Sequence, residues 1–87
     1  MNKDQIIARQ SSLKFVIEYL NLVSSPLPIN ETVGLTEVIT EYVLNGRTKD
    51  VVNKLNRFDH YLSDKVVTDI TTKVKFEMDG LNQERGV

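Results

Sequence analysis

The residues of this sequence that could do chemistry are few, and they gather around its one histidine. His60 is followed three positions later by Ser63, and aspartates stand at positions 59 and 64. A nucleophilic serine needs an adjacent base that orients and activates it, but the pattern puts His60 on the polar side of its segment. We therefore interpret His60 as a surface residue, with a functional contact as the alternative, and we expect no catalytic residues.

The sequence also lacks the residue patterns of metal sites and phosphate-binding loops. A zinc site takes three or four nitrogen or sulfur ligands, and this chain has one histidine and no cysteine. A phosphate-binding loop needs closely spaced glycines, whereas the four glycines stand far apart at 34, 46, 80 and 86. We expect no metal, no cofactor and no enzymatic activity.

Charge and composition restrict the possible partners. Eleven basic and twelve acidic residues give the 87-residue chain a net charge of −1, so no overall field draws it to nucleic acid. The hydrophobic share of 40% and the charged share of 26% are typical of one soluble globular domain, which we expect to span residues 1–87. No apolar run reaches the roughly 20 residues of a membrane span. Asp4 and Arg9 also interrupt any signal-like stretch, and the lack of cysteine fits a cytoplasmic location.

The element that the other segments must cover is the apolar stretch 13–23. At helical spacing it carries two neighbouring stripes. The first comprises Leu13, Val16, Ile17, Leu20 and Val23, and the second comprises Phe15, Tyr19 and Leu22. A helix that is apolar over most of its circumference is usually buried. We therefore predict one helix over 3–23, with a polar break at 10–12, that needs cover on two sides.

The second stripe has two interpretations. Phe15, Tyr19 and Leu22 pack inside the monomer against the C-terminal segment, or they form an interface with a second copy or with another protein. Aromatic residues one helical turn apart are suitable anchors for an interface. The three residues are our candidate protein interface.

A second helix is predicted to begin at an Asn30 cap and to end at Asn45-Gly46, because glycine suits the residue after a last helical turn. Its apolar stripe comprises Leu35, Val38, Ile39 and Tyr42, with Val43 beside it. Gly34 is either a weak point in the first turns or a place where another backbone comes close.

A third helix is predicted over 48–62 with a Thr48 cap. Its apolar seam comprises Val51, Leu55, Phe58 and Leu62, and the side chains that could touch nucleic acid are Lys49, Asn53, Asn56, Arg57 and His60. The short turn at Gly46 gives the layout of a helix-turn-helix. Alignment with that motif, however, puts Glu41, Asn45 and Arg47 at buried positions, so nucleic-acid binding is not favoured.

Residues 66–78 are ambiguous, because they alternate with period two and are rich in β-branched residues, as a strand does. The same segment also gives a helical stripe of Val66, Ile70, Val74 and Met78. We favour the helix because no second strand is available for pairing, and because Gly80 suits a helix end with Leu81 folded back on Phe76. In the alternative, the strand pairs with another copy across a dimer. Residues 81–87 are predicted to be a frayed tail.

Together these patterns predict a mainly α protein that folds as a small bundle of three to four helices. We expect a non-enzymatic protein–protein interaction module that self-associates as a dimer and presents a helical surface to an unknown protein partner. The alternative is a small nucleic-acid-binding transcriptional regulator that uses the third helix.

Overall fold

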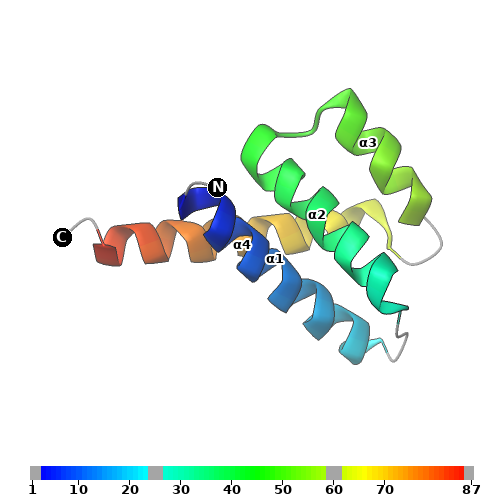
Figure 1. Cartoon of the computed structure of the whole chain (residues 1–87), viewed down its shortest axis with the longest axis horizontal. Coiled ribbons are helices and arrows are strands. Elements are labelled where there is room, and N and C mark those ends of the chain that lie inside the picture. Colours follow the sequence, from blue (N-terminus) through cyan, green and yellow to red (C-terminus); the bar gives the residue numbers. More distant parts are fainter. Residues whose placement is uncertain (1–2, 24–26, 59–61, 86–87) are drawn as a thin grey trace.

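The chain folds into a small bundle of helices (Figure 1). The computed structural model describes residues 3–23, 27–58 and 62–85. Within these ranges the elements are α1 (Lys3–Leu22), α2 (Ile29–Asn45), α3 (Lys49–Leu55), the 3-10 helix η1 (Asn56–Phe58) and α4 (Asp64–Arg85). The predicted mainly α fold is confirmed. No strand occurs in the described ranges, so the alternative of a strand over 66–78 is wrong.

Helix α1 packs against both α2 and α4, and α2 and α4 also contact each other (Figure 1). The chain runs in opposite directions through α1 and α2, and α4 crosses behind α1. Helix α3 packs on α2, on the side away from α1. The last turns of α4 project beyond the beginning of α1, so this end of the helix has fewer neighbours than its start.

The core forms where the apolar faces of α1, α2 and α4 meet. Its buried members are Val16, Leu20, Leu35, Ile39, Leu62, Val67, Ile70 and Val74. The predicted stripe of α2 is confirmed, because Leu35, Val38 and Ile39 are buried there and Tyr42 packs beside them. On α4 the buried spacing 67, 70, 71 and 74 is that of a helix face, which explains why a β-branched segment is helical.

The prediction that the whole stretch 13–23 is buried is wrong. Val16 and Leu20 are buried, but Leu13, Ile17 and Val23 are exposed, and Leu22 is 83% exposed. Their place is taken by residues from the beginning of the helix, where Ala8 and Ser12 are fully buried. The predicted polar break at 10–12 therefore includes two of the buried positions, Ser11 and Ser12.

Two of the predicted helix boundaries are confirmed. Gly46 has φ 84°, and its N–H donates to the carbonyl oxygen of Tyr42 at the end of α2. Thr48 caps α3, since its side-chain oxygen accepts a hydrogen bond from the N–H of Val51 at 3.1 Å. The predicted Asn30 cap is wrong, because α2 begins at Ile29 after Pro28 and has no side-chain cap.

The other two boundaries also differ from the prediction. The helix expected over 48–62 ends at Leu55 and tightens into η1, where Asn56 and Phe58 are weak helix formers. Helix α4 does not stop at Gly80 but continues to Arg85, so the predicted frayed tail is helical over 81–85. Gly80 thus lies inside a helix, where glycine costs about 1 kcal/mol of helix stability relative to alanine.

Candidate protein-interaction site

The three residues predicted as an interface lie together beside α4. Phe15 and Tyr19 are half-buried and pack against the core, whereas Leu22 stands out at the surface. All three line a hollow of about 450 Å³ between α1 and α4. The other lining residues are Glu18, Val66, Asp69, Ile70 and Lys73. Both interpretations of the stripe therefore describe a part of it: the aromatic rings complete the core at their inner edges and face the hollow at their outer edges.

A second hollow, of about 420 Å³, continues the first along α4. It is lined by Phe15, Thr72, Lys73, Phe76 and Glu77. Because Phe15 and Lys73 line both hollows, we treat them as one surface and name it the aromatic groove. Its largest exposed side chain is Phe76, which is 82% exposed.

Phe76 was missed as an interface residue by the sequence prediction, which placed it in a contact with Leu81 at a helix end. A signal was available in the sequence. Phe76 stands two residues from both Val74 and Met78, so it lies on the opposite side of a helix whose core face carries those two residues. A large aromatic residue at such a position is a candidate for a second contact surface when other exposed apolar residues lie beside it.

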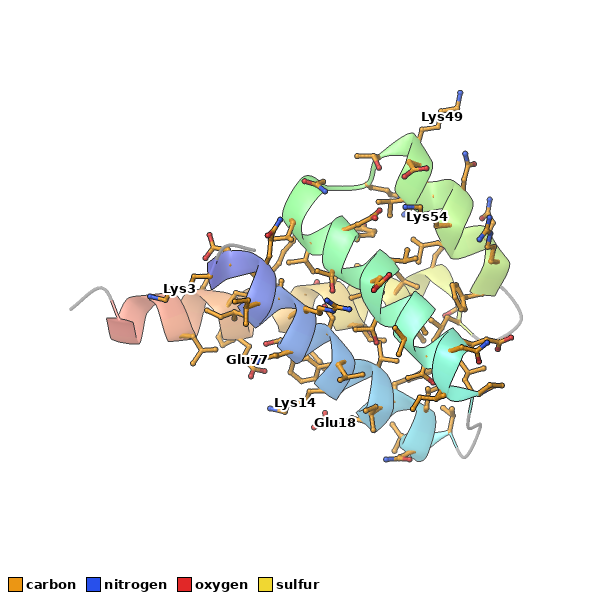
Figure 2. The ribbon with its side chains drawn as sticks, in the orientation of Figure 1. Lys3, Lys14, Glu18, Lys49, Lys54 and Glu77 are labelled. Carbon is orange, nitrogen blue, oxygen red and sulfur yellow. The ribbon has the colours of Figure 1, made fainter. Side chains whose placement is uncertain are left out.

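The charges around the aromatic groove are of both signs. Lys14 Nζ lies 3.6 Å from a carboxylate oxygen of Glu77 and 5.2 Å from the centre of the Phe15 ring. Figure 2 shows Lys14 and Glu18 along α1, with Glu77 of α4 behind them. An ion pair this exposed contributes about 0–1 kcal/mol, so it orients the two helices weakly. Together with Asp69 and Lys73, these groups give an apolar surface a polar rim.

A second exposed apolar surface lies where α1 meets α2. Arg9 and Glu37 form an ion pair at 3.0 Å across these helices. The two helices are antiparallel. Leu13, one turn after Arg9 in α1, therefore lies opposite Val33, one turn before Glu37 in α2. All of these side chains are exposed, and Ile29 beyond them is 83% exposed. This surface therefore places exposed apolar side chains of α1 and α2 side by side.

The candidate nucleic-acid contacts do not form one helical face. Lys49 and Asn53 lie on α3, and Lys49 points away from the bundle (Figure 2), whereas Asn56 and Arg57 belong to η1. His60 lies outside the described residues. Helix α3 has 7 residues, about two turns, which is short for an element that must reach into a groove. Nucleic-acid binding by this region stays a prediction that the geometry does not favour.

The charge on α3 is also partly neutralised. The Lys54 ammonium donates to both carboxylate oxygens of Glu41 on α2, at 3.0 and 3.1 Å, and lies 3.1 Å from Asp50. These hydrogen bonds, first to Glu41 and then to Asp50, raise the pKa of Lys54 above its usual value. Lys54 therefore serves to attach α3 to α2 and is not available to a phosphate.

The groups that could support catalysis are used elsewhere or stand apart. Ser63 Oγ accepts a hydrogen bond from the N–H of Val66 at 3.3 Å, so this serine caps α4. In the described part of the chain, no three histidine or acidic side chains come together as they would around a metal ion. An open hollow of about 480 Å³ between α1 and α2 is lined by charges already paired, because Arg9 binds Glu37 and Glu41 binds Lys54. Within the described ranges, no helix combines the length and apolar character needed to cross a membrane.

Comparison with known proteins gives no relative from which a function could be transferred. The chain matches no protein-family model, and neither a curated protein nor a solved structure matches it. Its function must therefore be argued from its own surfaces.

Proposed function

We propose that this chain is a non-enzymatic protein-interaction module that self-associates through the aromatic groove. One observation carries the proposal. Leu22 and Phe76, at the two opposite lobes of the groove, are 83% and 82% exposed. Burying a side chain of this size contributes roughly 1.5–3 kcal/mol. A partner that covers both lobes therefore gains two such contributions, one from each side chain.

The form of the groove suits a protein more than a small molecule. Small-molecule sites are concave and enclose most of the ligand surface, whereas here the two most exposed apolar side chains of the groove, Leu22 and Phe76, stand out from the surface. An apolar centre with a polar rim is typical of protein interfaces. The rim consists of Glu18, Asp69, Lys73 and the Lys14–Glu77 pair. We place this activity in the cytoplasm, because a chain without cysteine gains nothing from an oxidising compartment.

The test measures self-association by sedimentation velocity over a series of protein concentrations from low to high micromolar. Substituting Leu22→Ser removes an apolar side chain from the groove, and we expect it to raise the dimer Kd by about ten- to a hundredfold. The matched control is Ile29→Ser. Ile29 is also 83% exposed but lies at the start of α2, outside the groove, so this variant should dimerise as the unmodified chain does.

Two outcomes would contradict the proposal. A chain that stays monomeric at every concentration has no self-association to explain. An equal increase in the dimer Kd for Leu22→Ser and Ile29→Ser would show that association is nonspecific and hydrophobic and does not use the groove.

A further inference from the structure

Helix α3 and the 3-10 helix η1 form a unit at the outer edge of the bundle, which we name the α3 flap (residues 49–58). Figure 1 shows α3 beyond α2, on the side away from α1, and its contacts with the other α-helices are mainly with α2. Isolated helices shorter than about 12–15 residues are marginal in water, and α3 has 7 residues. The flap therefore owes its helical form to the contacts that attach it to the bundle.

The apolar layer between the flap and α2 is separate from the main core. Val51 of the flap is 2% exposed and Val38 of α2 is 6% exposed, yet neither belongs to the core cluster where α1, α2 and α4 meet. Leu55 and Phe58 are half-buried and reach the edge of that cluster. A domain has one contiguous core and smaller satellite clusters beside it. Detaching the flap therefore breaks a satellite layer and leaves most of the core in place.

The packing beneath the flap is incomplete. A hollow of about 210 Å³ lies between the flap and α2, and its lining includes Gly34, Val38 and Phe58. A Cβ atom added at Gly34 would lie 3.7 Å from the ring of Phe58, so the ring leaves room for a side chain that α2 does not supply there. Atoms that line a hollow lack partners on one side and lose dispersion attraction. The closed flap is thus held less firmly than a fully packed helix.

The polar attachment of the flap is also weak. Lys54 donates to both carboxylate oxygens of Glu41 on α2, but 37% and 39% of the two side chains are exposed. Ion pairs in contact with water contribute little to stability. Among the described residues, no other ion pair joins the flap to another helix. Polar contacts therefore do not make up for the small apolar layer.

The residues that flank the flap are fixed to parts of the bundle that do not depend on it. Before the flap, the N–H of Gly46 donates to the carbonyl oxygen of Tyr42 at the end of α2. After the flap, Leu62 is buried in the core. Gly46 has φ 84°, a region that glycine enters without steric cost, so the chain can change direction there. The flap can therefore leave α2 without displacing the other helices.

We infer that the α3 flap opens as a unit while α1, α2 and α4 stay folded, and that its opening uncovers the face of α2 that carries Gly34 and Val38. Segments with few buried apolar contacts open at a lower free energy than the whole domain. The flap lies on the side of α2 away from α1, whereas the aromatic groove lies between α1 and α4. The chain thus has a concealed apolar surface besides its exposed one, and this inference is independent of self-association.

Hydrogen–deuterium exchange followed by mass spectrometry tests this opening, at a protein concentration low enough to keep the chain monomeric. Peptides from 49–58 should exchange at least about a hundredfold faster than peptides from 68–78. Val74→Ala should speed the exchange of 68–78 at least about tenfold and leave that of 49–58 unchanged, because Val74 keeps its core contacts when the flap is open. Val51→Ala is the matched variant in the flap. It should speed exchange in both regions, because the contacts of Val51 are lost in local and in global opening alike.

Thiol labelling tests what the opening uncovers. The chain has no cysteine, so Val38→Cys and Val74→Cys each introduce a single thiol at a buried position. The thiol at position 38 should react with a soluble disulfide reagent at least about a hundredfold faster than the thiol at position 74, because flap opening gives access to the first alone.

Two results overturn the inference. If Val74→Ala speeds the exchange of 49–58 as much as that of 68–78, the flap opens only when the whole chain unfolds. If the thiols at positions 38 and 74 react at the same rate, no local opening reaches the face of α2 beneath the flap. The labelling result does not depend on the stability of Val74→Ala, so it decides the question even where that variant fails to fold.

Discussion

In the first half of α1, residues 3–12, three of the four buried side chains are small, and Ile7 is the fourth. In the second half, residues 13–22, Val16 and Leu20 are buried, but other large apolar side chains lie at the surface. Ala8 and Ser12 are fully buried, while Leu13, Ile17 and Leu22 are exposed. Hydropathy alone predicts the reverse order. The two halves belong to one helix and contact the same two neighbours, so the difference lies in side-chain size.

Small side chains let helices approach closely, because the distance between helix axes depends on the residues at the contact. Ala8 and Ser12 take little room, so α1 can lie close to its neighbours at these positions. In the second half, Phe15 and Tyr19 pack against the core only in part, and hollows remain beside them. The first half therefore packs closely through small side chains, and the second half contributes Val16 and Leu20 to the core and leaves the apolar surface that our proposed function uses.

The largest expected effect tests the exposure of the second half and compares two leucines that stand two positions apart. Leu20 is buried in the core, and we expect Leu20→Ala to lower the free energy of unfolding by about 2–5 kcal/mol. Leu22 is mostly in water, so Leu22→Ala should change it by less than about 0.5 kcal/mol. Urea unfolding followed by circular dichroism measures both values. The protein concentration must be low enough to keep the chain monomeric, because association adds to apparent stability.

A comparable loss of stability in both variants would mean that Leu22 is as buried as Leu20. Leu22 would then not be available to a partner.

The next largest expected effect concerns the close packing around Ala8. Replacing this fully buried residue with a larger one, Ala8→Leu, should lower the free energy of unfolding by about 1–3 kcal/mol, because the neighbours must move apart. Gln10→Leu adds an apolar side chain of the same size two positions later, at an exposed site, and should change stability by less than about 0.5 kcal/mol. Thermal unfolding of the two variants side by side gives the comparison. If Ala8→Leu is as stable as the unmodified chain, the first half is not closely packed.

The elements of this fold could be predicted from the sequence because each follows from local chemistry. The stripe of Leu35, Val38 and Ile39, the Thr48 cap and the glycine at position 46 each depend on residues within one or two turns. Gly80 shows the limit of prediction from local residues. Glycine occurs both just after the end of a helix and inside helices. Which of the two applies depends on whether the following residues continue the helix, as 81–85 do here.

The groove could be predicted only in part, because it depends on how two helices cross. The spacing of Phe15, Tyr19 and Leu22 placed them on one face, and that is a property of α1 alone. Whether that face is closed or open is decided by the position of α4, which no pattern within α1 contains. Phe76 was missed for the same reason, since its exposure is visible only once the core face of α4 is known.

A smaller effect is expected at Ser12, whose buried hydroxyl has no hydrogen-bond partner in the described structure. A buried hydroxyl without a partner is unfavourable, and alanine is the better helix former. We therefore expect Ser12→Ala to raise the free energy of unfolding by about 0.5–1.5 kcal/mol. Ser11→Ala is the control, because the Ser11 hydroxyl is not among the fully enclosed unpaired groups and only the gain in helix propensity applies. Chemical denaturation that shows no greater gain at position 12 than at position 11 would argue that the Ser12 hydroxyl finds a partner in solution.

The smallest expected effect concerns the ion pairs that the two halves of α1 form with neighbouring helices. In the first half, the Arg9 guanidinium lies 3.0 Å from the carboxylate of Glu37 on α2. In the second half, the Lys14 ammonium lies 3.6 Å from the carboxylate of Glu77 on α4. All four side chains keep contact with water, so each coupling should lie within about 0.2–1 kcal/mol, with the shorter Arg9 pair the stronger. Double-mutant cycles with Arg9→Ala and Glu37→Ala, and with Lys14→Ala and Glu77→Ala, measure the two couplings at low salt. Because Lys14 and Glu77 stand at the rim of the aromatic groove, their coupling should increase on dimerisation, when the partner excludes water, while that of Arg9 and Glu37 stays constant. A Lys14–Glu77 coupling that is the same in monomer and dimer would place the second copy away from this rim.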